Sequence, residues 1–173
     1  MTKILEWIFR GPKITGSMRQ VITAHAISYT GTGTNTREYI GAHVLLHVYM
    51  VNRRIAPTTI KSFYVFAKIG GKWVKAQLLS IPEGFKLSEC PYIDFSRSVL
   101  ADKAGLELLE YGKGVSGWLR VMFKGIQRDD VLKVDYRIDA VDAFDHTHKI
   151  ILKYKDGRIG DLDYFPGAGM TPY

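Results

Sequence analysis

The sequence contains a single cysteine, Cys90, among its 173 residues. One cysteine cannot form a disulfide within the chain, and no other Cys or His lies near it at the spacing of a metal site. This cysteine usage is typical of proteins in a reducing compartment. The expected location is therefore the cytoplasm for the chain as written, or an extracytoplasmic space if an N-terminal signal or anchor has been removed.

Long hydrophobic runs are also missing. The longest apolar run near the N-terminus covers six residues, 4–9, and is interrupted by Glu6, so it is too short to cross a membrane as a helix. Its apolar residues recur at helical spacing until Gly11-Pro12, which predicts a short amphipathic helix within residues 1–12. Such a segment would dock on a partner or a membrane surface, or cover an open end of the main domain.

Catalytic and cofactor motifs are absent. The glycine-rich stretch 30–36, TGTGTNT, has no lysine and precedes a strand pattern, whereas a phosphate-binding loop carries Gly-Lys-Ser/Thr and opens a helix. Asp135 and Asp139 share a strand face about 13 Å apart, which exceeds the roughly 5 to 10 Å between paired glycosidase carboxylates. Ser17 and Ser116 lack a nucleophile elbow. The sequence therefore favours a non-catalytic protein and predicts no cofactor.

Histidines are possible metal ligands, and the spacing of the histidines leaves one predicted hairpin turn to consider. Two of the five histidines lie four residues apart within 39–52, about 13 Å along a strand, which is too far to chelate one ion. His146 and His148 lie close to Asp142 and Asp145, and these residue types either hold a metal or cap a turn. The turn interpretation is favoured, and no metal site is predicted.

Basic residues outnumber acidic ones, and the formal net charge is +7. Residues 1–75 carry 11 Lys and Arg against 2 acidic side chains, whereas residues 76–173 carry 13 against 15. An excess of one sign can mark a surface for an anionic partner. Strands from both halves of a β-sandwich interleave, however, so this asymmetry need not produce a charged face.

The strongest structural signal is residues 39–52, YIGAHVLLHVYMVN, in which apolar residues occupy every second position. This period of two predicts a β-strand. The alternate positions are also mostly apolar or aromatic, so we expect protein over both faces and a central position in a sheet. The rest of the domain should be built onto this strand.

Shorter segments with the same period indicate further strands, and Gly70-Gly71 predicts a tight hairpin between two of them. Residues 98–111 fit a helix and a strand equally. The predicted fold class is all-β, an antiparallel two-sheet sandwich at residues 17–155 with an irregular or helical insertion and a tail at 156–173. The additional strands are predicted at residues 17–30, 62–69, 72–81, 115–124, 131–144 and 148–154. Between the sheets we expect Val44, Leu46, Val48, Val65, Val74, Trp118, Val134, Tyr136 and Ile138.

A set of landmarks over residues 39–152 resembles uncharacterised bacterial immunoglobulin-like or telokin-like domains. In order, these are Asn52 at a strand end, Pro57 with Thr58-Thr59-Ile60, Gly71-Lys72-Trp73, Gly112, Gly117-Trp118-Leu119 and Phe123. The resemblance implies an immunoglobulin-like fold with a binding or structural role. It carries over no catalytic residues.

Two functions remain in view. The first is a non-catalytic domain for protein interaction, self-association or structure. The second is a module that stacks aromatic rings and binds an anion such as single-stranded nucleic acid. The ligand-binding candidates are Tyr64, Phe66 and Trp73 as stacking planes, with Lys68, Lys75, Arg53 and Arg54 for the anion. The alternation places all of them except the two arginines on one outer sheet face. In the alternative interpretation, residues 1–10 or 85–111 cover the three rings as a second small core.

Overall fold

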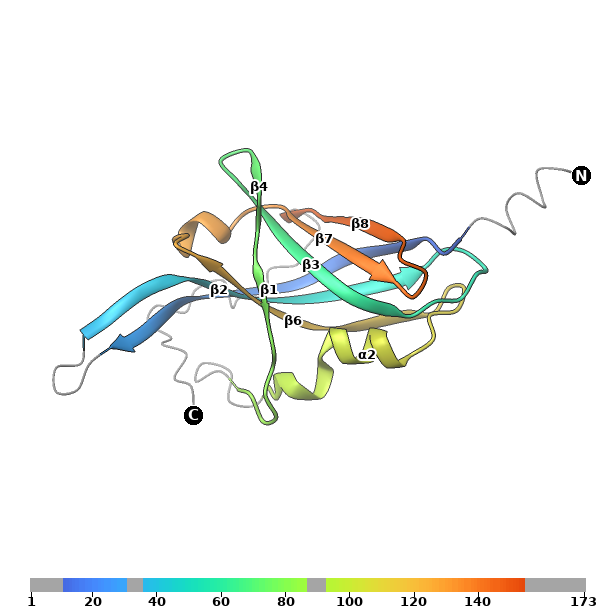
Figure 1. Cartoon of the computed structure of the whole chain (residues 1–173), viewed down its shortest axis with the longest axis horizontal. Helices are drawn as coiled ribbons and strands as arrows, with labels where there is room; N and C mark the ends of the chain where they lie inside the picture. The colour runs from blue at the N-terminus through green and yellow to red at the C-terminus, as the bar shows by residue number, and fades with distance from the viewer. Residues whose placement is uncertain (1–10, 31–35, 87–92, 155–173) are drawn as a thin grey trace, which may run out of the picture.

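The computed structural model describes residues 11–30, 36–86 and 93–154, with the backbone alone described at 24–30 and 36–39. The chain forms two antiparallel four-stranded sheets, with strand orders β1-β2-β6-β5 and β4-β3-β7-β8 (Figure 1). This confirms the all-β class and the two-sheet arrangement. The predicted N-terminal helix, the C-terminal tail and Cys90 lie outside the described residues. The strands are β1 (Ile14–Thr30), β2 (Thr36–Asn52), β3 (Ile60–Ile69), β4 (Lys72–Lys75), β5 (Gln77–Leu79), β6 (Gly114–Lys124), β7 (Tyr136–Asp142) and β8 (Thr147–Leu152).

Strand β2 is central, as its pattern predicts, because β1 pairs along one edge and β6 along the other. Its inward residues from Ala42 to Met50 are fully buried, and on the outward face Leu45 is buried too. The pairing of β2 with β6 ends at Gly41↔Lys124, whereas β1 and β2 remain paired to Thr30↔Thr36. The two strands therefore project beyond the sandwich as a two-stranded ribbon (Figure 1).

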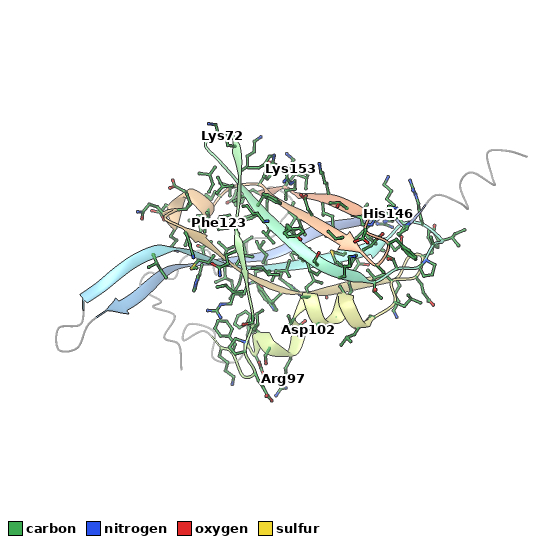
Figure 2. All side chains as sticks on the ribbon, viewed as in Figure 1. Lys72, Arg97, Asp102, Phe123, His146 and Lys153 are labelled. Atoms are coloured by element: carbon green, nitrogen blue, oxygen red, sulfur yellow. The ribbon has the colours of Figure 1, made fainter. Side chains whose placement is uncertain are left out.

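The main core lies between the two sheets and includes Phe123 of β6 (Figure 2). Burial of apolar side chains here supplies the main driving force for folding, at about 25 cal/mol per Å². Most of the predicted inner residues are confirmed in this core: Val44, Leu46, Val48, Val65, Tyr136 and Ile138 are buried, and Val74 is partly buried against them.

The Gly70-Gly71 hairpin is confirmed. Ile69 pairs with Lys72 across a two-residue turn, and both glycines have positive φ, +54° and +81°, which residues with a Cβ rarely adopt. The prediction of one strand over 72–81 is wrong, because the chain changes sheets at the buried Ala76. The Ala76 N–H still bonds to Val65 O at 2.8 Å, after which β5 pairs with β6 in the other sheet.

Residues 93–111 form a 3-10 helix, η1 (Phe95–Ser98), and an α-helix, α2 (Leu100–Leu106), so the helical alternative holds for the middle of this segment. Leu100 and Ala104 of α2 are fully buried in the main core. Gly117 of β6 permits this approach, because a Cβ there would lie 2.6 Å from Ser98 O. The helix thus closes the sandwich beside β6 and β3 (Figure 1).

Trp118 lies on the opposite face of β6 from the main core, so its predicted place between the sheets is wrong. Leu119, Val121 and Phe123 occupy the inward positions of β6, and the period of two therefore sends Trp118 outward. There it forms a second cluster with Phe95, edge-to-face at 4.9 Å between ring centroids. The remaining buried members of this cluster are Ile22 and Leu45.

Strand β7 is shorter than the predicted 131–144. Residues Asp129–Val131 form a second 3-10 helix, η2, and the strand begins only at Tyr136. Val134 therefore packs partly buried against the core from the connection and not from a strand. The Tyr136 hydroxyl donates to Val131 O and fixes this connection; burial raises the pKa of that hydroxyl.

Candidate binding face

The sheet β4-β3-β7-β8 exposes one broad surface, here called the outer face, formed by the side chains that point away from the core. Burial alternates along its strands, as in a sheet with one packed and one exposed side. The outer face comprises Tyr64, Phe66 and Lys68 of β3, Trp73 and Lys75 of β4, Arg137 and Asp139 of β7, and Lys149 and Ile151 of β8. It therefore brings together five of the seven sequence-predicted ligand-binding residues.

Arg137 is the central residue of this face. Its guanidinium carbon lies 4.0 Å from the ring centroid of Phe66 and 5.3 Å from that of Trp73. Its Nε lies 3.0 Å from Oδ1 of Asp139, and Nη2 donates to Oδ2 at 3.3 Å. The two half-buried rings and the Asp139 carboxylate thus all contact the guanidinium, and cation–π attraction is strongest where water is partly excluded.

Tyr64 and Ile151 are the apolar groups most open to solvent on this face, each 43% exposed. The Lys75 ammonium lies 4.4 Å from the Tyr64 ring centroid. Cross-strand pairing places Lys75, Phe66, Arg137 and Ile151 in one row across the four strands, and Tyr64 lies two residues before Phe66 in the adjacent row. A cation therefore lies over the ring of each of the two aromatic residues that β3 contributes to this face, Tyr64 and Phe66.

Three lysines of the outer face, Lys68, Lys75 and Lys149, form no ion pair with a carboxylate of the described residues. Beside the face, Lys153 pairs with Asp135 at 2.9 Å. Hydrogen bonds from Lys153 and from the Tyr154 N–H lower the pKa of Asp135, with a smaller contribution from the Lys68 charge. The outer face is therefore cationic, with its positive charge carried mainly by lysines.

Arg53 and Arg54 do not join this face. They lie in the connection before β3, whereas Phe66 and Lys68 are in the second half of that strand. The Arg54 Nη1 donates to Gly11 O at 3.1 Å, and its backbone N–H bonds to Oδ1 of Asn52. The sequence could not place them because their distance from the aromatic residues depends on where β3 begins.

Arg137, Lys149 and Ile151 are members of the face that sequence reasoning did not select. The alternation within 131–144 already assigns Arg137 to the polar side of its strand. What is missing from the sequence is the pairing of β7 with β3, which places Arg137 opposite Phe66. Non-local strand pairing has no signature within either strand.

The Asp142 carboxylate organises the β7–β8 turn and is fully buried. Oδ1 accepts the N–H groups of Phe144 and His146, each at 2.9 Å, and Oδ2 lies 2.9 Å from His148 Nε2. The Ile14 N–H donates to His148 Nδ1 at 3.4 Å, so Nε2 carries the ring proton and donates it to Asp142. Both ring nitrogens of His148 are thus engaged in joining β8 to β1.

These contacts determine the charge state of Asp142. Burial by itself raises the pKa of the carboxyl, but the hydrogen bonds from His148 and from the backbone of His146 and Phe144 outweigh it and leave the pKa below its usual value. Within the described residues, no group of three or more His, Cys, Asp and Glu side chains is arranged to hold a metal ion. The hydrogen bonds of Asp142 to Phe144, His146 and His148 show the carboxylate capping the turn.

The outward side of the other sheet differs, because the chain covers it. Phe95 packs on Trp118, which stacks on His47 with ring centroids 4.7 Å apart. Burial, then the charges of Arg19 and Lys103, lower the pKa of His47, while burial and Arg120 lower that of His43 to about 4. The described part of 85–111 therefore covers this sheet and not the outer face; η1, which carries Arg97, lies far from Lys72 (Figure 2).

A cavity of about 250 Å³ opens beside β5, between β6 and the start of α2. Its lining is mostly apolar, with Asp102 and Arg120 as its charged groups. Ligand pockets of proteins usually measure roughly 300 to 1,000 Å³. In addition, the Arg120 Nη1 donates to Ser80 O and its guanidinium lies 4.7 Å from the Phe85 ring centroid. The outer face is therefore the better candidate.

Searches of protein-family models, curated proteins and solved structures find no match to this chain. No helix in the described parts of the chain is long and apolar enough to span a membrane. The outer face is the feature from which a function is inferred.

Arg137→Met is expected to lower the free energy of unfolding by about 1–2 kcal/mol. Methionine keeps the aliphatic part of the side chain, but it removes the cation over Phe66 and Trp73 and leaves Asp139 without its partner. Chemical denaturation of parent and variant measures the difference. Arg53→Met, the same change at an exposed arginine, should leave the unfolding midpoint unchanged; equal effects at both positions would contradict the structural role of Arg137.

Proposed function

We propose that this protein is a non-catalytic interaction domain that binds a protein partner through its outer face. One observation carries the proposal: within the described residues, the sandwich covers one sheet with its own helical segment and leaves the other sheet open, with Tyr64 and Ile151 exposed on it. Interfaces between proteins are enriched in aromatic residues and arginine, the composition of the centre of this face.

We also propose that the sandwich is immunoglobulin-like. The strand order β1-β2-β6-β5 and β4-β3-β7-β8 supports this, because it corresponds to the A-B-E-D and C′-C-F-G sheets of that architecture. The Tyr136 hydroxyl, at the start of β7, bonds to a carbonyl five positions upstream, like the tyrosine corner at the same place in those domains. Such a sandwich is compatible with a binding role, but the role is argued from the outer face and not from the fold.

Single-stranded nucleic acid is the second candidate, favoured by the cationic character of the face. Nucleic-acid binding by stacking needs a ring face that a base can reach. Here Arg137 lies over Phe66 and Trp73, and Lys75 lies over Tyr64. A base would have to displace these cations, so the protein partner is favoured.

Site-specific photo-crosslinking tests the protein-binding role. With p-benzoylphenylalanine in place of Tyr64, irradiation of cells that produce the protein is expected to give a discrete intermolecular adduct. The same replacement at Tyr111, which is 62% exposed but lies in the connection before β6, is the matched control and should give none. The absence of an adduct at position 64, or the same adduct at both positions, would argue against the outer face as the binding surface.

A further inference from the structure

We infer, resting on the binding role proposed above, that the outer face docks on an acidic protein surface: a partner with an apolar centre and carboxylates around it. The charge of the face supports this chemistry. Asp139 is neutralised by Arg137 at 3.0 Å, which leaves Lys68, Lys75 and Lys149 without a carboxylate among the described residues. Bringing carboxylates to these ammonium groups supplies the missing opposite charge.

The arrangement of the face matches the anatomy of a protein interface, in which an apolar centre is surrounded by polar groups. Tyr64 and Phe66 of β3 and Ile151 of β8 flank Arg137 and Asp139 of β7 in two adjacent cross-strand rows, and because Arg137 and Asp139 pair with each other the middle of the face carries no net charge. Lys75 and Lys149 lie on the two edge strands of the same sheet. At about 4.8 Å between strands, the edges are about 14 Å apart. Carboxylates of the partner are therefore needed on both sides of an apolar patch.

The other occupants of such a face fit less well. A second copy of this chain carries a formal charge of +7, so two copies repel each other. Nucleic acid would supply phosphate charge, but the cations over the three aromatic rings oppose base stacking. An acidic protein surface satisfies both the lysines and the apolar centre.

Binding of defined probes tests this inference. The probe is a fluorescent random copolymer of glutamate and tyrosine, compared with polyglutamate of similar length and with a 20-nucleotide oligothymidylate. The full-length parent is expected to bind the copolymer best, and more weakly as salt is added, since exposed charge pairs are screened. Lys75→Glu with Lys149→Glu should weaken that binding about tenfold or more, because two attractions become repulsions.

The control is Lys113→Glu with Lys124→Glu, two exposed lysines away from the outer face. It changes the net charge by the same amount. If the weakening is specific to the outer face, this control should alter the affinity for the copolymer by less than about twofold. Thermal melts verify that both double variants fold. If the Lys75→Glu, Lys149→Glu variant does not fold, Lys75→Gln with Lys149→Gln replaces it. Equal weakening by both pairs would reduce the effect to net charge and overturn the inference.

Other outcomes assign the face differently. Tighter binding of oligothymidylate, lost in the Lys75/Lys149 variant, would identify nucleic acid as the ligand. A dimeric parent that Tyr64→Glu converts to a folded monomer would assign the face to a second copy. If neither acidic polymer binds while crosslinking at position 64 still yields an adduct, the acidic partner is wrong but the protein-binding role stands.

Discussion

Asp142→Ala is expected to lower the free energy of unfolding by about 3 kcal/mol or more, a large share of the roughly 5–15 kcal/mol that holds a domain together. The carboxylate is fully buried and accepts from His148 and from the N–H groups of Phe144 and His146. Alanine removes the acceptor of all three donors, leaves the buried His148 Nε2–H without its partner, and releases the imidazole that joins β8 to β1 through the Ile14 N–H. Urea denaturation monitored by circular dichroism measures the loss.

Asp130→Ala is the matched control, because Asp130 is exposed, and it should change stability by about 0.5 kcal/mol or less.

The pH dependence of stability gives a second check on the role of Asp142. Because the pKa of Asp142 in the folded state lies below its unfolded value of about 3.9, its contribution is present above about pH 4 and is lost as the pH falls through the folded pKa. The Asp142→Ala variant should therefore lose stability less steeply than the parent on acidification. Part of the acid sensitivity should remain in the variant, because the pKa values of Asp94 and Asp135 are also lowered. A variant as acid-sensitive and as stable as the parent would contradict this role for Asp142.

Gly41→Ala is expected to cost about 3 kcal/mol or more. Gly41 has φ +153°, a conformation that side-chain-bearing residues rarely adopt, and a Cβ at this position would lie 2.2 Å from Phe123 O. The obstacle is β6 backbone, which cannot move without disturbing the final rung of the β2–β6 pairing, Gly41↔Lys124. Thermal and chemical denaturation should both report the loss, and the backbone amides near this rung should exchange faster with deuterium.

Gly112→Ala separates the two causes. Gly112 also has positive φ, +73°, but a Cβ there would meet no atom within 4 Å, so only the conformational penalty of about 1 kcal/mol is expected. The difference between the variants then measures the clash with β6. If both substitutions cost the same, the close approach of β2 and β6 at Gly41 does not constrain the fold.

The sequence by itself determined the features that depend on neighbouring residues. The period of two over 39–52 specified a strand buried on both sides, and Gly70-Gly71 specified a two-residue turn because only positive φ allows it. The alternation in β3 and β4 also placed Tyr64, Phe66 and Trp73 on the same face. Each of these depends on backbone geometry within a few residues, which the local sequence encodes directly.

The tertiary structure alone decided which strands pair and which face is covered. The chain changes sheets at Ala76 although the apolar period continues without a break, because a strand carries the same pattern whichever neighbour it bonds to. For the same reason nothing in 85–111 indicated that Phe95 packs on Trp118 rather than on Phe66, since an apolar side chain is stabilised by burial against either surface. The role of Arg137 likewise follows from the β3–β7 pairing, which brings together residues about 70 positions apart in the chain.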